Sequence, residues 1–165
     1  MRLLFTIVAM FIVRLAMASY ILIPMDDSQK NHLKAYGISF WILENDIEME
    51  WLLNYRGGSF LVKHYNDIEE ECVVRGVSYQ VIADVQASLI IEEIADPEVN
   101  MEVVKLETFP KIAVYSPKSK LPWDDAVTLV MAYAEIPYEI IYDEEIVRGD
   151  LPKYDWLHLH HEDFT

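Results

Sequence analysis

Hydrophobic positions along this chain recur in two alternating patterns, a short extended one and a longer helical one. Residues 20–25 read Y-I-L-I-P-M, which predicts a strand, and apolar side chains at helical spacing predict a helix over 28–44. The polar residues at 26–28 are its predicted caps. Residues 48–54 read E-M-E-W-L-L-N and predict a second strand. A strand, a helix and a strand in this order predict a βαβ unit with parallel strands.

The middle of the chain favours helices. Residues 67–74 carry an acidic face, and residues 84–95 place apolar side chains on one stripe. Residues 101–106 then alternate between apolar and polar positions like a strand. Pro110 follows and restricts the residue before it to extended conformations, so we expect a boundary between two segments here.

After this boundary the same alternation begins again. Strands are predicted at 111–115, 138–142 and 154–159, with a helix that opens at Trp123 and closes at Pro137. Alternating strands and helices predict the opening of a doubly wound α/β domain with a mostly parallel sheet, of the flavodoxin-like or amidotransferase-like kind.

The expected fold class is therefore α/β, built from parallel-sheet βαβ units. We expect an N-terminal α/β segment at 19–108 and the first part of the doubly wound domain at 109–165. Three strands with one long helix cannot cover both faces of a parallel sheet, and such sheets are normally buried on both sides. The sheet of the second segment is either covered by helices of the first segment or completed by residues beyond Thr165. We expect the latter, with the C-terminal part of the protein missing here.

The first eighteen residues have the three parts of a secretory signal. Arg2 precedes an apolar run at 3–13, and Ala16-Met17-Ala18 supplies the small-residue cleavage pattern. This run is shorter than the roughly 20 apolar residues of a membrane span. We expect cleavage after Ala18 and an exported protein, periplasmic or secreted, without a stable membrane span; a retained anchor is the alternative.

The negative net charge limits the classes of partner that the protein is expected to bind. The formal net charge is −15, and removal of Arg2 and Arg14 with the signal would move it to −17. Such a field repels nucleic acid phosphates and favours cations or basic partners, although solubility alone also explains it. Cys72 is the only cysteine, so the chain forms no internal disulfide.

Residues 155–165 read D-W-L-H-L-H-H-E-D-F-T and gather three of the five histidines beside acidic side chains. Side chains alternate along a strand, so Trp156, His158 and His160 are predicted to face one way. Ligands of open α/β sheets bind outside the carboxyl ends of the strands, which makes this end a candidate cleft. The catalytic candidates are His161, Glu162 and Asp163, and the ligand-binding candidates are His158 and His160.

The same residues leave alternatives open. Two histidines two positions apart on a strand, His158 and His160, can hold one metal ion, with Glu162 or Asp163 completing or orienting the site. A packed histidine and a solvated H-H-E-D loop are the structural alternatives. We therefore assign no metal and predict no cofactor. If the cleft is catalytic, His161 is the predicted proton-transfer group.

A second candidate follows the strand at 48–54. Paired glycines, Gly57 and Gly58, let a backbone approach a ligand closely, and Arg56 could grip a carboxylate or phosphate in a bidentate fork. The segment matches neither the P-loop nor the dinucleotide-binding pattern, and a tight turn is the alternative explanation of the glycines.

Six blocks carry a resemblance to a known family: Y-I-L-I-P-M-D-D, N-H-L-K-A-Y-G, W-L-L-N-Y-R-G-G-S-F, K-I-A-V-Y-S-P, L-P-W-D-D-A-V-T-L-V and K-Y-D-W-L-H-L-H-H-E-D-F-T. Together they resemble exported bacterial proteins labelled asparagine synthetase B. The resemblance covers essentially the whole chain after the signal. It implies a class I glutamine-amidotransferase-like α/β fold in a longer protein, of which this chain is the N-terminal part.

The motifs do not support the synthetase label itself. A glutamine-dependent asparagine synthetase needs a cysteine at the mature N-terminus and an S-G-G-x-D-S loop, whereas here Ser19 is the expected start and 56–61 read R-G-G-S-F-L. The resemblance therefore implies a hydrolase-like enzyme or a degenerate relative that only binds a small molecule. The alternative is a non-catalytic envelope module that binds a protein or glycan through tyrosines and tryptophans.

Overall fold

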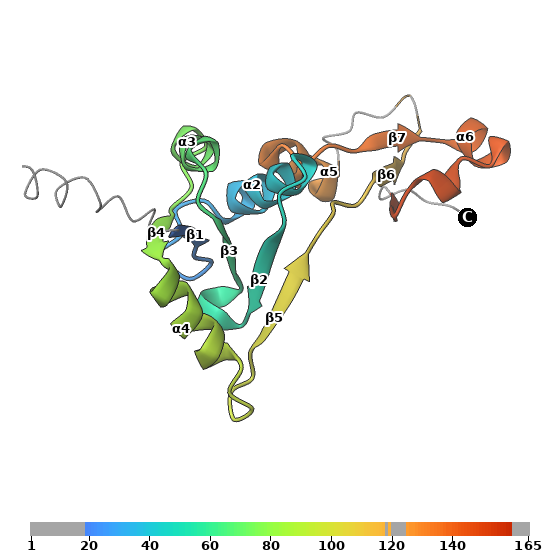
Figure 1. Ribbon diagram of the computed structural model, residues 1–165. Coiled ribbons are helices and arrows are strands. Elements are labelled where there is room, and N and C mark those ends of the chain that lie inside the picture. Colours follow the sequence, from blue (N-terminus) through green and yellow to red (C-terminus); the bar gives the residue numbers. More distant parts are fainter. Residues whose placement is uncertain (1–18, 118, 120–124, 160–165) are drawn as a thin grey trace, which may run out of the picture.

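The computed structural model describes residues 19–117, 119 and 125–159, which form two sheets with helices packed around them (Figure 1). The first segment contains β1 (Ser19–Ile23), α2 (His32–Glu44), β2 (Met49–Leu53), η1 (Tyr55–Gly57), β3 (Ser59–Lys63), α3 (Asn66–Val74), β4 (Gln80–Ala83), α4 (Asp84–Ile94) and β5 (Glu102–Leu106). The second contains β6 (Ile112–Tyr115), α5 (Ala126–Ala134), β7 (Glu139–Ile141), α6 (Asp143–Arg148), η3 (Leu151–Lys153) and β8 (Trp156–Leu159). The described residues are thus mixed α/β.

The first sheet has the strand order β4-β1-β3-β2-β5, and every neighbouring pair is antiparallel. β1 and β2 run in the same direction, but β3 lies between them, and β1 likewise lies between β3 and β4. Two split βαβ units therefore interleave, as in ferredoxin-like folds, with β5 added beside β2. The prediction of a parallel sheet is wrong for this segment.

The physical reason is β3, which the hydrophobic pattern does not reveal. Phe60 and Val62 belong to the core on one face of the sheet, and Leu61 belongs to the core on the other. A central strand buried on both faces shows no alternation of apolar and polar residues, so this short run reads as part of a turn. β4 was also not predicted.

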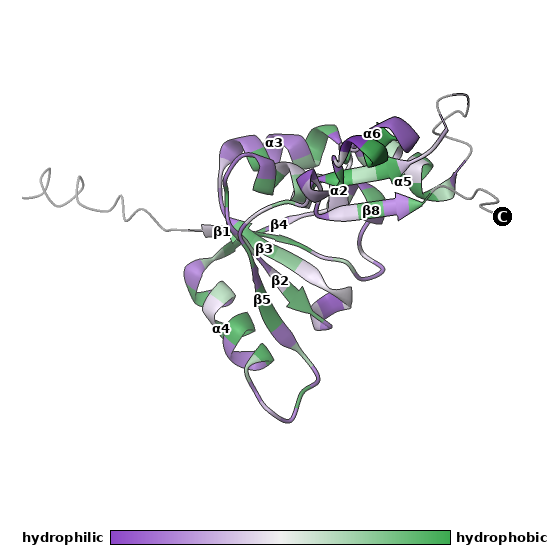
Figure 2. Ribbon diagram, turned by 90° about the vertical axis from the view of Figure 1, so that its right-hand side faces the viewer, coloured by the Kyte–Doolittle hydropathy of each residue, from purple (hydrophilic) through white to green (hydrophobic). Residues whose placement is uncertain are grey.

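Helices cover both faces of the first sheet (Figure 2). On one face, Ile38 and Ile42 of α2 and Ile68 and Cys72 of α3 are fully buried against the sheet. On the other, Ala87 and Ile94 of α4 pack in a second buried cluster. At about 25 cal/mol per Å² of apolar surface, burial on both faces is the main stabilisation of this segment.

The second sheet has the order β7-β6-β8, and both pairs are parallel, which confirms the parallel prediction for this segment. The predicted strands and the helix between them are present, and the acidic connection after β7 forms the short helix α6. On β8, Leu157 is 38% and Leu159 is 54% exposed. The specific flavodoxin-like arrangement is not established by these three strands.

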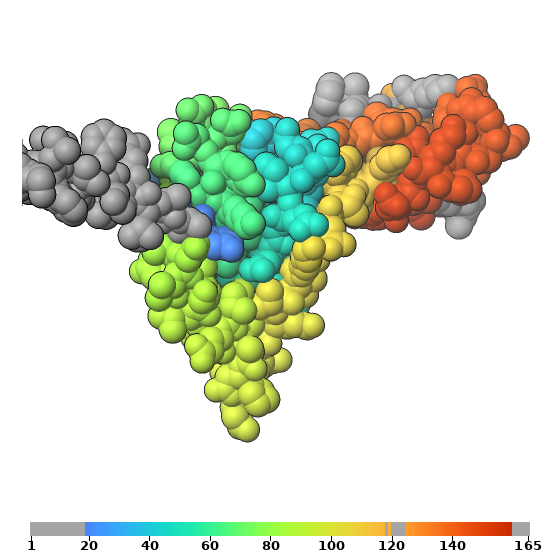
Figure 3. Space-filling view, in the orientation of Figure 1, coloured from blue at the N-terminus to red at the C-terminus, as the bar shows by residue number. Residues whose placement is uncertain are grey.

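β5 leads directly toward the second sheet and runs as a yellow band along the edge of the molecule in the space-filling view (Figure 3). The two segments then meet where α5 packs on α2. Phe40 of α2 contributes to one buried cluster with Ile112 of β6 and Met131 of α5. The predicted boundary at residue 109 stays a prediction, and helices from both sides of it are in contact.

Gly37 makes this helix contact possible. A Cβ atom at Gly37 would lie 1.7 Å from the carbonyl oxygen of Ala134 in α5. Polar contacts surround this point: Lys34 Nζ pairs with Glu135 Oε1 at 2.5 Å, and Asn31 donates to the Tyr133 hydroxyl at 2.7 Å. The two helices therefore approach closely enough for backbone contact.

None of the helices in the described parts of the chain is long and apolar enough to cross a membrane.

We predict that Gly37→Ala destabilises the protein. Glycine to alanine within a helix normally stabilises it by about 1 kcal/mol, but here the methyl group would overlap the Ala134 carbonyl and push α5 away. Overpacking of this kind costs roughly 1–3 kcal/mol. Denaturant unfolding measures the change, with Glu44→Ala, at an exposed site on α2, as the control. A Gly37→Ala protein more stable than wild type would contradict the close approach.

Candidate functional site

The glycine turn after β2 has an unusual backbone. Asn54 and Arg56 adopt φ values of 61° and 46°, and Gly57 and Gly58 adopt 82° and 94°. L-residues with side chains seldom occupy this left-handed region, and each that does costs about 1–2 kcal/mol. Asn54 and Arg56 are therefore strained positions in this turn, and Arg56 is itself one of the residues that the sequence predicts as a ligand contact.

Packing against the loop after β1 explains Gly57. A Cβ atom there would lie 2.3 Å from the Met25 carbonyl oxygen, and the Met25 backbone N–H donates to the Arg56 carbonyl at 3.1 Å. The two backbones thus approach too closely for a side chain. The close approach that the glycines suggested is present, and its partner in this structure is the protein's own chain.

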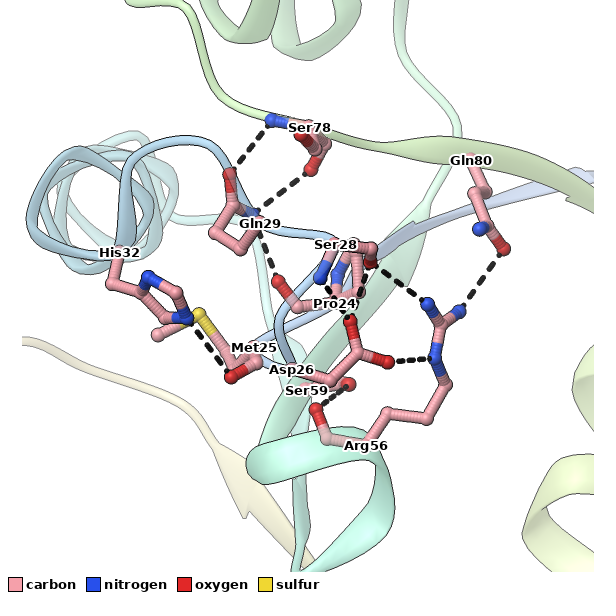
Figure 4. Close-up of polar contacts among 10 residues, drawn as sticks. All are labelled: Pro24, Met25, Asp26, Ser28, Gln29, His32, Arg56, Ser59, Ser78 and Gln80. Carbon is pink, nitrogen blue, oxygen red and sulfur yellow. Dashed lines mark hydrogen bonds and ion pairs between the residues drawn. The ribbon is translucent and has the colours of Figure 1, made fainter.

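The Arg56 side chain reaches three groups from two other segments (Figure 4). Its Nε donates to Asp26 Oδ2 at 2.6 Å, Nη2 donates to Ser28 Oγ at 3.1 Å, and Nη1 donates to Gln80 Oε1 at 3.3 Å. Hydrogen bonds from Arg56 and then from Ser28 lower the pKa of Asp26 to about 2. The guanidinium therefore joins the loop after β1 to the start of β4.

Asp26 was predicted as a cap of the following helix, and this is wrong. The cap of α2 is Asn31, whose side chain accepts from the Lys34 N–H at 3.2 Å. Asp26 instead lies beside Arg56, because the chain between β1 and α2 first forms a turn in which the Gln29 N–H donates to the Asp26 carbonyl.

A buried glutamine extends the same cluster (Figure 4). Gln29 donates from Nε2 to the carbonyls of Pro24 and Ser78, at 2.8 and 3.1 Å, and accepts from the Ser78 N–H at 2.8 Å. His32 donates from Nε2 to the Met25 carbonyl at 3.1 Å. These bonds hold the exit of β1 against the entry of β4. Ligand binding by Arg56, Gly57 and Gly58 stays a prediction, and the arginine donors already serve this internal contact.

A second constellation lies at the carboxyl edge of the parallel sheet. Asp125 caps α5: its Oδ1 accepts from the backbone N–H groups of Val127 and Thr128 at 2.8 and 3.2 Å. The same oxygen lies 3.1 Å from His158 Nε2. Because an ionised carboxylate only accepts, Nε2 is the donor, and Nδ1 of a neutral imidazole is left as an acceptor.

His158 is accessible, whereas Asp125 is not. The His158 side chain is 18% exposed, and that of Asp125 is 7% exposed. α5 begins at the edge where the parallel strands end, so its first residue and the end of β8 lie side by side although they are 33 positions apart. The arrangement can orient an imidazole for hydrogen bonding or proton transfer.

Polar side chains also follow the other two strands at this edge. Ser116 is buried directly after β6, and its N–H donates to the Ile141 carbonyl at 3.0 Å. The Tyr115 hydroxyl donates to Asp143 Oδ1 at 2.6 Å, which raises the pKa of Tyr115 to about 12. All three parallel strands therefore end among hydrogen-bonding groups, as in α/β proteins that bind ligands at this edge.

Most of the predicted histidine cluster falls outside the described residues. This applies to His160, His161, Glu162 and Asp163, so the catalytic and metal-binding hypotheses for them stay predictions. Among residues 19–117, 119 and 125–159, no group of three histidine, cysteine, aspartate or glutamate side chains is arranged to hold a metal ion.

A third cluster of hydrogen-bonded side chains was not predicted from the sequence. Glu69 of α3 accepts from His64 Nε2 at 2.7 Å and from the Tyr79 hydroxyl at 2.9 Å. These bonds lower the pKa of Glu69 and raise that of Tyr79. The only available signal was the five-residue separation of His64 and Glu69, which indicates nothing by itself.

Comparisons with protein-family models, with curated proteins and with solved structures give no match. The resemblance to the exported proteins labelled asparagine synthetase B therefore rests on the six sequence blocks alone.

We predict that Gly57→Ala destabilises the protein more than Gly76→Ala does. Both glycines have positive φ values, 82° and 69°, but a Cβ atom at Gly76 meets nothing within 4 Å. The Gly76 variant should lose about 1–2 kcal/mol for its backbone conformation alone. The Gly57 variant should lose at least about 1 kcal/mol more, through overlap with the Met25 backbone. Denaturant unfolding of both variants tests this, and equal losses would contradict the proposed contact.

Proposed function

We propose that this chain is the ligand-binding part of an exported α/β protein that takes a small polar molecule at the carboxyl edge of the β7-β6-β8 sheet. The hydrogen bond between Asp125 and His158 carries this proposal. A buried carboxylate that orients an accessible imidazole is an arrangement suited to binding and to proton transfer. His158 is the residue that would contact the ligand.

The electrostatics favour an aspartate that stays charged and fixed in position. Two backbone N–H groups at the start of α5 donate to Asp125 Oδ1, and the positive end of the helix dipole favours a negative charge there. This carboxylate in turn favours the imidazole tautomer with its proton on Nε2. Nδ1 of His158 would then accept a hydrogen bond or a proton from the ligand.

The family resemblance suggests which functional group the ligand carries. An amidotransferase-like or hydrolase-like relative would act on an amide or a related carbonyl compound, with His158 or the predicted His161 moving protons. A relative without a nucleophile would bind the same molecule without turning it over. The hydrogen bond between Asp125 and His158 is compatible with an enzyme and with a relative that only binds the molecule.

Export forms part of the same proposal. The apolar run and the Ala16-Met17-Ala18 pattern support a cleaved signal. Ser19, the first residue after the expected cleavage position, pairs with Ala83 of β4 within β1. Cleavage there would leave the described part of β1 intact.

Exposed aromatic rings favour a second candidate function, a non-catalytic envelope module that binds a protein or glycan. Trp156 is 46% exposed on β8, and Tyr133 of α5 is 50% exposed. Rings of this kind supply contact area with a polar edge. Because the Tyr133 hydroxyl already accepts from Asn31, Trp156 is the better candidate of the two.

The test uses the chain with His158→Gln as the variant and His64→Gln, distant in sequence and bound to Glu69, as the matched control. Nuclear magnetic resonance follows the ring nitrogens during titration with a neutral amide, propionamide, whose N–H groups can donate to Nδ1 of His158. We expect shifts at His158 and about tenfold weaker binding by His158→Gln, since a lost hydrogen bond to a charged or oriented group costs about 1.5 kcal/mol.

Equal binding by the wild type and His158→Gln would contradict the site, as would shifts confined to the surroundings of Arg56. If the wild type releases the hydrolysed product and His158→Gln does not, the protein is a hydrolase that uses His158. If the wild type binds the amide without hydrolysing it, the protein only binds its ligand.

A further inference from the structure

A cavity of about 350 Å³ opens on the first sheet, away from the edge that carries His158. It lies at the end of the sheet where β1 and β2 begin and β3 ends. Its charged lining residues are Asp46, Glu48, Glu50, Lys63 and Lys105, and the tyrosines Tyr20 and Tyr65 and the apolar Leu61 lie among them. Its volume is at the lower end of the range for small-molecule sites.

Strand pairing places these side chains on one face. Glu50 of β2 lies between its partners Leu61 of β3 and Lys105 of β5, and Tyr20 of β1 pairs with Lys63 of β3. Leu61 is 2% exposed and belongs to the core on the α4 side. The cavity therefore has an apolar floor at Leu61, with charged groups on two sides of it.

Glu50 is a charged group without a partner in the described structure. Lys105 is directly across from it, but the Lys105 ammonium lies 2.9 Å from Glu48 and 2.7 Å from Glu107 instead. None of the described residues donates a hydrogen bond to Glu50 or forms an ion pair with it. Partial burial raises the pKa of Glu50, so the carboxylate is desolvated without compensation.

Lys63 is the complementary group. It lies two residues beyond Leu61 on the same strand, which puts it diagonally across from Glu50 at about 7–8 Å between backbone positions. No described residue forms an ion pair with the Lys63 ammonium either. Glu50 and Lys63 are thus an acid and a base without ion-pair partners in the described part of the chain, both next to Leu61, in a cavity that Asp46 and Glu48 also line.

Two tyrosines also line the cavity. Tyr20 pairs with Lys63 across the strands, and Tyr65 follows β3 and is 46% exposed. Aromatic faces beside a carboxylate attract an ammonium group through cation–π interaction, worth about 0.5–1 kcal/mol at exposed sites.

We propose that this cavity binds a zwitterion of amino-acid size, with its ammonium at Glu50, its carboxylate at Lys63 and its apolar part over Leu61. An amine alone would leave Lys63 unpaired and close to a like charge. A carboxylate alone would do the same at Glu50. A molecule that carries both charges a few ångströms apart satisfies both groups at once. The site is separate from the His158 edge and does not depend on it.

The experiment titrates the full chain with L-leucine and with two molecules that each lack one of its charges. 3-Methylbutylamine has no carboxylate, and 4-methylpentanoate has no ammonium. Calorimetry should show leucine binding at millimolar concentrations and about tenfold weaker binding of each single-charge molecule, because each loses one charged contact. Equal binding of leucine and either analogue would overturn the proposal, and so would no leucine binding.

Two variants test whether leucine binds in this cavity. Glu50→Gln and Lys63→Met should each weaken leucine binding about tenfold, whereas Glu70→Gln, an exposed acid on α3, should not change it. Glu50→Gln should also unfold at the same or a higher temperature than wild type, because it removes a desolvated charge. Binding retained by Glu50→Gln would overturn the proposal. His158→Gln should bind leucine normally, so a failure of this site and a failure of the His158 site are distinguishable.

Discussion

The contact between α2 and α5 at Gly37 joins the two halves of the structure. A glycine there lets the Ala134 backbone lie directly against α2, where even a methyl group would overlap it. α2 is consequently buried on two sides, against the first sheet and against α5. Around the contact, Glu135 lies 2.5 Å from Lys34 Nζ and 3.1 Å from Arg75 Nη1, so one carboxylate joins α2, α3 and the end of α5.

Placement of α5 also sets the geometry of the candidate site. Asp125 begins this helix, and the position of its carboxylate decides where His158 is held. The C-terminal end of α5 is fixed by Gly37 and Glu135, and its N-terminal end meets the carboxyl edge of the parallel sheet. A shift of α5 at one end would therefore move the hydrogen bond at the other, because a helix transmits displacement along its axis.

Much of the secondary structure could be predicted from the sequence, since its periodicities are local. β1, α2, β2, α4 and the parallel sheet follow from apolar spacing. The order of strands in the first sheet could not be predicted, because β3 is apolar on both faces and its partners are set by tertiary packing. A βαβ pattern indicates strand direction correctly here but says nothing about a strand inserted between the two.

The candidate site residues could likewise be predicted only in part. The sequence singled out Arg56 and His158, but it could not reveal their partners Asp26 and Asp125, which lie 30 and 33 positions away. Both side chains thus have partners within the described chain, and ligand binding by Arg56 and by His158 stays a prediction. The unpaired Glu50 and Lys63 carry no sequence signal at all, because strand registry alone brings them together.

The contact between α2 and α5 joins both sheets into one cooperative unit. Native-state hydrogen exchange at increasing denaturant can test this by comparing the buried amides of Ile38 in α2, Leu61 in β3 and Val114 in β6. We expect all three amides to converge on one opening free energy. Val114 exchanging through a separate opening of lower free energy, while Ile38 and Leu61 stay protected, would contradict it.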